Sequence, residues 1–262
     1  MASLTMSAAG LTALTKDEGS VDGLYDDPSG YCTYGVGHLV HTTDKWSSFL
    51  LAAAQANATW KAKLLTAYGT VTYLPRTAAA WADLADLKTK AVELGQVTVA
   101  KKKGKDFDKL NDADKATMKG VADAAVQVEA DLIARSVSNV LKGDLGSYET
   151  AVNTKITGVT LTQDEFDALV SLAFNIGVGN FGSSGVVKKI NENKYRAGDA
   201  TAARETAISE IETAFGQWNK SGGVVLAGLT TRRASEATRF LKGARDEVAA
   251  MKTKAAAPAA KK

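Results

Sequence analysis

The chain has 262 residues, of which 45% are hydrophobic and 23% are charged, an ordinary composition for a globular protein that can bury a core. Its net charge of +3 is too small to indicate a nucleic-acid partner, and no stretch approaches the roughly 20 apolar residues of a membrane span. The only cysteine, Cys32, excludes an internal disulfide, and we expect it to be a buried structural thiol.

The N-terminal stretch MASLTMSAAGLTALTKDEG has no charged leader and no continuous apolar run, so we expect no signal peptide. Ser7 can cap a short helix over residues 7–17, which Gly19 ends. This helix places Glu18 at its C-terminal end.

A small hairpin follows. Residues 27–30, Asp-Pro-Ser-Gly, suit a type I turn, and the flanking stretches GLY and YCTYGVGHLV predict strands. Gly35 and Gly37 inside the second strand indicate that another element approaches the backbone closely.

The same stretch holds groups that suit glycoside hydrolysis. Glu18 ends a helix, Asp27 lies in a polar turn, and the hydroxyl of Thr33 follows six residues later. An acid, a base and a hydroxyl that orients water are the groups this reaction needs. By composition alone, surface turn residues are an equally good interpretation.

The middle of the chain carries no recognisable chemistry. Its pattern predicts helices over residues 46–68, 76–94 and 121–141, an extended piece over 69–75, and a charged, solvated loop over 101–115.

The second half has stronger signals. Thr162 and Glu165 form a capping box ahead of a buried helix that ends at Gly177. Further helices are predicted over 184–191, 199–215 and 231–251.

At this point the chain resembles the phage-type lysozymes, the muramidases of glycoside hydrolase family 24. The residues that carry the resemblance are Glu18-Gly19, Tyr25, Asp27, Gly30-Tyr31, Thr33, Gly35, Gly37 and His38, with FDALVSLAFNIGVGNF at 166–181 and GLTTRRASEATRFLKG at 228–243. The resemblance covers roughly residues 4–44 and 130–245.

The resemblance implies specific roles. Glu18 would be the general acid, Asp27 would activate or stabilise, and Thr33 would help hold the attacking water. The usual outcome is inversion, which needs carboxyl groups about 6.5–9.5 Å apart. Arg232 or Arg233 would pair with the acid, and the sequence does not distinguish between them.

Two further roles also come from the resemblance. His38 would be structural rather than catalytic, and would pair with an aspartate on a long connecting helix. Asp131 is the predicted partner, and Asp144, past Gly143, is the weaker choice. Asn175 would contact the sugar chain.

We therefore predict an α+β, mostly helical, two-lobe lysozyme-like fold with a small β-hairpin lobe and a helical lobe. Residues 1–250 would form one catalytic domain, interrupted by an insertion at about 45–130 in or next to the small lobe. Residues 251–262 would be a disordered, low-complexity tail. The insertion could cap the cleft, bind the cell wall or a partner, or enlarge the lobe. Its tryptophans could stack on sugars, although core packing is favoured: Trp46, Trp60 and Trp81.

The leading hypothesis is a muramidase that cuts bacterial peptidoglycan, most naturally a phage endolysin. The alternatives are a lytic transglycosylase, an antibacterial effector carried by a secretion machine, a virion-borne lysin, a non-catalytic cell-wall-binding module and a structural phage component. We expect a monomer with no metal or other cofactor, no nucleic-acid partner and no stable membrane insertion. It would be made in the bacterial cytoplasm and act on the wall after release by another protein.

Overall fold

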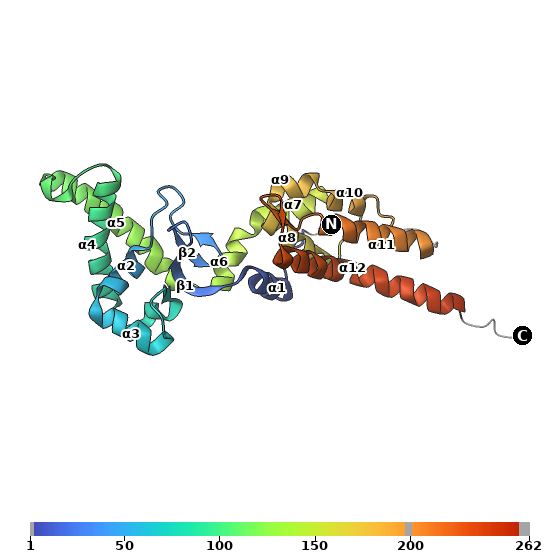
Figure 1. Cartoon of the computed structure of the whole chain (residues 1–262), viewed down its shortest axis with the longest axis horizontal. Helices are drawn as coiled ribbons and strands as arrows, with labels where there is room; N and C mark the ends of the chain where they lie inside the picture. The colour runs from blue at the N-terminus through green and yellow to red at the C-terminus, as the bar shows by residue number, and fades with distance from the viewer. Residues whose placement is uncertain (1–2, 197–200, 257–262) are drawn as a thin grey trace, which may run out of the picture. The chain divides into compact units, whose positions relative to one another are not determined.

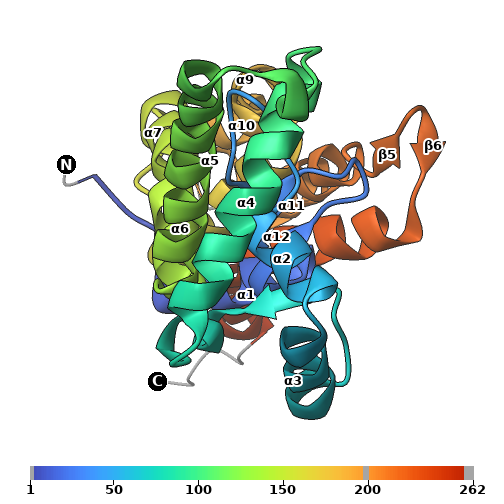
Figure 2. The ribbon, with the colours of Figure 1, turned by 90° about the vertical axis from the view of Figure 1, so that its left-hand side faces the viewer.

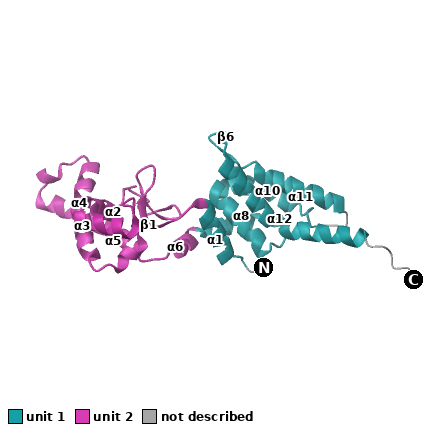
Figure 3. Ribbon diagram, turned by 60° about the horizontal axis from the view of Figure 1, so that its bottom comes forward, with its two compact units in different colours: residues 1–17, 145–262 teal, residues 18–144 magenta. Residues whose placement is uncertain are grey.

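A computed structural model describes residues 3–196 and 201–256. The chain divides into two compact units (Figures 1 and 3), unit 1 with residues 1–17 and 145–262, and unit 2 with residues 18–144. The fold is α+β and mostly helical, with one small antiparallel sheet in unit 2, as predicted.

Unit 2 contains the hairpin and the predicted insertion. Its elements in chain order are β1 (Val21–Asp26), β2 (Cys32–Gly35), β3 (His38–Leu39), α2 (Phe49–Ala56), α3 (Ala58–Tyr68), β4 (Tyr73–Pro75), the 3-10 helix η1 (Arg76–Ala80), α4 (Leu84–Lys102), the 3-10 helix η2 (Phe107–Lys109), α5 (Asp112–Ile133) and α6 (Val137–Asp144).

The sheet has the strand order β3-β2-β1-β4, and all its pairings are antiparallel. The single second strand that we predicted is two strands, β2 and β3, because the chain turns between them. Gly35 and Gly37 have positive φ angles of 62° and 73°, which L side chains rarely adopt, so glycine suits both positions of this turn.

The segment predicted to be an insertion contributes to this sheet. Its extended piece forms β4, which pairs with β1 at one end of the sheet. The helix predicted over 46–68 is two helices, because Asn57 takes an extended conformation and caps the second through the backbone N–H of Trp60. Beyond β4, α4 and α5 pack side by side as a helical hairpin (Figure 2).

The tryptophans of the insertion belong to the core of unit 2. Trp46 and Trp60 are 8% and 2% exposed, and the half-buried Trp81 packs against the same cluster. Its ring lies 5.3 Å from that of Trp60 and 6.3 Å from that of Tyr68. The expectation of core packing is therefore confirmed for these three residues.

The helix predicted over residues 121–141 is wrong in both its bounds. Helix α5 starts at Asp112, where the Asn111 side chain caps it, and it ends at Ile133. A separate helix, α6, then runs through Gly143 to Asp144. Glycine inside a helix costs only about 1 kcal/mol, so it does not by itself end one.

Unit 1 is helical apart from a short hairpin. Its elements in chain order are α1 (Ala8–Glu18), α7 (Gly146–Lys155), α8 (Gln163–Ile176), α9 (Val178–Ser183), α10 (Gly185–Asn191), α11 (Thr201–Gly216), β5 (Lys220–Ser221), β6 (Val224–Val225) and α12 (Ala227–Ala256). The last residue of α1, Glu18, already belongs to unit 2.

Most helix limits predicted for unit 1 hold. The capping box of Thr162 and Glu165 is confirmed at the start of α8, and Ser184 caps α10. Residues 199 and 200 of the predicted helix 199–215 lie outside the described residues. The predicted disordered tail is wrong over residues 251–256, which continue α12, because its alanines and lysines favour a helix. Residues 257–262 lie outside the described residues.

A buried carboxylate fixes the start of α1. Asp167 of α8 is fully buried and accepts hydrogen bonds from the Ser7 backbone N–H, at 3.0 Å, and from the Ser7 hydroxyl. The Ser7 hydroxyl oxygen accepts the Gly10 N–H at 3.0 Å, and Arg239 donates to Asp167 at 3.2 Å. The helix that ends in Glu18 is therefore anchored to α8 and α12.

Candidate active site

Glu18 is the last residue of α1 and is exposed. Gly19, which follows with a φ of 74°, ends the helix as predicted, and β1 begins two residues later at Val21. The candidate acid therefore lies at an exposed position where the helix passes into the hairpin.

Asp27 lies in the predicted turn between β1 and β2. The backbone N–H of Gly30 donates to the Asp27 carbonyl at 2.8 Å, which closes the turn. The side-chain Oδ1 of Asp27 accepts the N–H groups of Ser29 and Tyr31 at 2.8 and 2.9 Å. Two backbone donors thus fix the orientation of this half-buried carboxylate.

Two hydrogen bonds to the backbone of Tyr31 link Thr33 to Asp27. The Thr33 hydroxyl donates to the Tyr31 carbonyl at 3.0 Å, while the Tyr31 N–H donates to Asp27. Thr33 is only 3% exposed. The structure therefore brings Asp27 and Thr33 together, whereas the separation of the Glu18 and Asp27 carboxyl groups stays a prediction.

Tyr25 completes this part of the hairpin. It is the cross-strand partner of Thr33, so their side chains share the face of the sheet opposite the buried Leu24 and Tyr34. Burial and the nearby charge of Asp27 raise the pKa of Tyr25, so its phenol stays neutral at pH 7. We had assigned Tyr25 no role, and the strand register is the signal that could have placed it.

His38 pairs with a different aspartate from the one predicted. Its Nδ1 lies 2.9 Å from both carboxylate oxygens of Asp144, the last residue of α6. The predicted partner, Asp131, is exposed on α5 and accepts a hydrogen bond from Gln127 at 2.7 Å. The error has a physical reason, since the predicted single helix is two, and α6 packs against β3. The pairing agrees with a structural role for His38, which stays a prediction.

The predicted close approach at Gly35 is confirmed. A Cβ atom at this position would lie 2.8 Å from Cγ1 of Val137, the first residue of α6. No atom lies within 4 Å of the corresponding point at Gly37, whose requirement for glycine is conformational. The hairpin and α6 are thus packed backbone against side chain.

The two arginines predicted near the acid are buried on α12 in unit 1. Arg232 Nε and Arg233 Nη2 donate to the same oxygen, Glu236 Oε1, at 3.1 and 2.9 Å. The Ser171 hydroxyl also donates to this oxygen, at 2.7 Å. Burial raises the pKa of Glu236, and the two arginines act in the opposite direction.

Glu236 is a residue that the sequence analysis missed. Its separation of four and three residues from Arg232 and Arg233, a helical spacing, is the signal that could have found it. The pairing of either arginine with Glu18 stays a prediction. Asn175 is exposed in the last turn of α8, and its contact with the sugar chain also stays a prediction.

Across the described residues, every helix is too short or too polar to cross a membrane.

Comparison with known proteins gives a consistent result. Residues 111–236 match the family described as phage lysozyme. The chain is 38% identical over 112 residues to the endolysin of Bacillus phage PZA, a match over 43% of this chain and 38% of the relative. It is 39% identical over 106 residues to the SAR-endolysin of Haemophilus phage HP1, over 38% of this chain and 53% of the relative.

Two solved structures are also similar. The muramidase domain of SpmX from Asticcacaulis excentricus is 22% identical, with a TM-score of 0.46 and coverage of 90% of this chain and 97% of that one. An endolysin from an Escherichia coli O157:H7 phage is 20% identical, with a TM-score of 0.47 and coverage of 92% and 96%.

These matches cover only part of this chain and part of the two endolysins. The chain spans about two fifths of the length of the PZA endolysin and about half that of the HP1 protein. The family match starts at residue 111, inside the predicted insertion, and Glu18, Asp27 and Thr33 lie outside it.

Proposed function

Because this chain belongs to the phage lysozyme family through residues 111–236, we propose that it is a muramidase of bacterial peptidoglycan. It would hydrolyse the β-1,4 bond between N-acetylmuramic acid and N-acetylglucosamine. The observation that carries the proposal is the hairpin after Glu18, in which the Tyr31 backbone holds both the carboxylate of Asp27 and the hydroxyl of Thr33.

In this proposal the exposed Glu18 protonates the glycosidic oxygen. Both turn N–H groups bind Oδ1 of Asp27, so we assign to Oδ2 the removal of a proton from the attacking water. The Thr33 hydroxyl donates its own proton to Tyr31, so its oxygen can accept a hydrogen bond from that water. A water between acid and base would give inversion at the anomeric carbon.

The proposal also assigns roles to residues outside the hairpin. Asn175 would contact the glycan, Arg232 or Arg233 would pair with Glu18, and the protein would act as a monomer. The two relatives are phage endolysins, which favours a phage endolysin that reaches the wall after release by another protein. Delivery by a secretion machine or on a virion would use the same residues.

The test is digestion of purified peptidoglycan, with mass spectrometry of the soluble products. We expect wild type to release fragments with reducing muramic acid ends and Glu18→Gln to lose at least about 1,000-fold in rate, because it removes the general acid. Asp17→Asn, which changes the neighbouring exposed acid on the same helix end, is the matched control and should stay within about twofold of wild type.

Two other results would reassign the protein. Anhydromuramic ends would make it a lytic transglycosylase and leave Asp27 and Thr33 without their roles. No fragments from folded wild type, together with binding to the wall, would indicate a non-catalytic binding module.

A further inference from the structure

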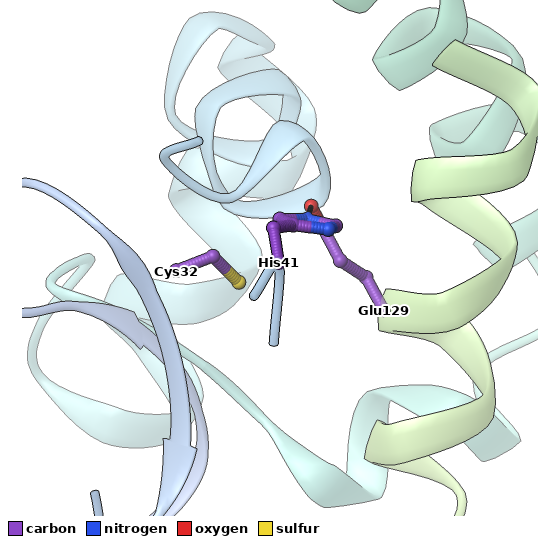
Figure 4. A group of neighbouring side chains, drawn as sticks. All are labelled: Cys32, His41 and Glu129. Atoms are coloured by element: carbon purple, nitrogen blue, oxygen red, sulfur yellow. Dashed lines mark hydrogen bonds and ion pairs between the residues drawn. The ribbon is translucent and has the colours of Figure 1, made fainter. Parts of the chain in front are cut away.

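Three side chains of metal-binding type meet inside unit 2. They are Cys32 on β2, His41 just after β3, and Glu129 on α5 (Figure 4). One sulfur, nitrogen or oxygen atom of each lies within 4.8 Å of those of the other two. The side chains of Cys32 and Glu129 are fully buried, and His41 is 8% exposed.

The carboxylate of this cluster is held by the first turn of α2. Glu129 accepts the backbone N–H groups of Phe49 and Leu50 at 2.9 and 2.8 Å, and the Ser48 hydroxyl at 2.8 Å. The fourth contact, at 2.8 Å, joins Glu129 Oε1 to Nε2 of His41. Three of the four contacts therefore orient the carboxylate without involving the other two members of the cluster.

In this arrangement a cation could take the place of one hydrogen bond, the contact between His41 and Glu129. A metal bound between His41 and Glu129 would displace the proton shared by Nε2 and Oε1 and the proton of the Cys32 thiol. The three hydrogen bonds from α2 would remain as outer contacts that fix the ligand, a common feature of protein metal sites.

The set of ligand types indicates which metal. Thiolate, imidazole and carboxylate together favour Zn²⁺, whereas Mg²⁺ and Ca²⁺ prefer oxygen ligands alone. With bonds of about 2.0–2.3 Å in tetrahedral geometry, ligand atoms lie about 3.3–3.6 Å apart. The 4.8 Å limit on the three atoms is close enough for small side-chain rotations to reach this spacing.

The surrounding charge also suits a cation. Asp26, the cross-strand partner of Cys32, accepts the Ser48 N–H at 2.7 Å, so a second carboxylate lies at the start of α2. Together with Glu129, this gives two carboxylates at the same helix start, and their negative charge would attract a cation.

We propose that Cys32, His41 and Glu129 form a buried Zn²⁺ site with a water as fourth ligand. The metal would connect β2, the segment after β3, and α5, and so would fix the sheet that carries the hairpin to the helical hairpin of α4 and α5. This inference does not depend on the proposed muramidase activity.

The test uses the full chain, reduced and stripped of metal with a chelator that is then removed. Titration with Co²⁺ should give one equivalent of binding, a near-ultraviolet thiolate-to-cobalt charge-transfer band, and visible bands typical of four-coordinate cobalt. Zn²⁺ should displace the Co²⁺ and raise the midpoint of thermal unfolding.

Variants separate the ligands from other groups. Cys32→Ser should lose the charge-transfer band, and His41→Gln should weaken Zn²⁺ binding by more than about 100-fold, since loss of an outer contact alone costs roughly 10–100-fold. His38→Gln is the matched control, because His38 also pairs with a carboxylate, and its Zn²⁺ affinity should equal that of wild type.

Two results would overturn the proposal. One is a wild-type protein that binds neither Co²⁺ nor Zn²⁺ in the folded state. The other is a cobalt spectrum without a thiolate band, or one that Cys32→Ser leaves unchanged. In either case the cluster would serve only to cap α2. Glu129 is left unchanged in this test because its substitution is expected to destabilise unit 2 even without a metal, which would complicate the reading of metal affinity.

Discussion

The start of α1 in unit 1 and the start of α2 in unit 2 are fixed by the same device with different partners. In each, a fully buried carboxylate from another helix, Asp167 or Glu129, accepts hydrogen bonds from the first turn. Asp167 pairs with Arg239, a permanent cation, whereas Glu129 pairs with the imidazole of His41. The two helix starts thus share one anchoring arrangement but differ in the partner of the carboxylate, a guanidinium in unit 1 and an imidazole in unit 2.

The largest effect should come from neutralising the two carboxylates. Glu129→Gln places an amide N–H₂ among four donors, and we expect a loss of about 3–5 kcal/mol in the free energy of unfolding. Asp167→Asn should cost less, about 2–3 kcal/mol, because Arg239 keeps a second partner in Asp164.

Urea unfolding at pH 7 in the presence of a chelator measures both losses, and amide hydrogen exchange shows which helix start opens. Equal losses, or a larger loss for Asp167→Asn, would mean that the type of counter-ion does not distinguish the two sites.

A smaller effect is expected at Gly10 in the first turns of α1. A Cβ atom there would lie 2.6 Å from Cγ and Oδ2 of Asp167. Gly10→Ala should therefore displace the Asp167 carboxylate from the start of α1 and lower the free energy of unfolding by about 1–2 kcal/mol. Gly120→Ala in α5 is the control, because no atom lies within 4 Å of its Cβ position, and it should gain roughly 0.5–1 kcal/mol from helix propensity. Thermal unfolding of the two variants measures both changes. A Gly10→Ala variant more stable than wild type would contradict the close packing of Asp167 against the start of α1.

The smallest expected effect concerns the charge of Asp26, near the start of α2. The pKa of Asp26 is raised above its ordinary value of 3.8, so its protonated form stabilises the fold below pH 3.8, and this contribution is lost as the pH rises through the folded-state pKa. Asp26→Asn stays neutral and can still accept the Ser48 N–H. It should therefore be more stable than wild type at pH 7, by only a few tenths of a kcal/mol, roughly, because the side chain is exposed.

The measurement is the stability difference between Asp26→Asn and wild type from pH 3 to pH 7, with chelator present. The difference should shrink as the pH falls. A difference that does not change with pH would show that Asp26 has the same pKa in the folded and unfolded states.

Several features could be predicted because each depends only on residues close together in the sequence. The turn at Asp27, the capping box at Thr162 and the end of α1 at Gly19 each depend on residues within a few positions. The hydrogen bonds that join Asp27 and Thr33 through Tyr31 lie in one seven-residue stretch, so their proximity could be predicted.

Features that depend on tertiary packing could not be predicted in this way. The partner of His38 was missed because a break between α5 and α6 moves Asp144 to the end of a second helix. Nothing in the local pattern links Cys32 or His41 to Glu129, because 88 residues separate the histidine from the glutamate. Similarly, no short-range pattern shows that β4 pairs with β1.

The pairing of β4 with β1 decides which strand lies at this edge of the sheet. At Gly23 a Cβ atom would lie 2.0 Å from the Leu74 carbonyl oxygen, so only glycine lets β4 lie this close to β1. Without that strand, β1 would present unpaired N–H and C=O groups to other chains, a template for aggregation. The strand that replaces it at the edge has three residues and ends in Pro75, which has no N–H to offer a neighbour. Strand β4 therefore acts as a protective border of the sheet, and Gly23 is the position in the hairpin that makes this border possible.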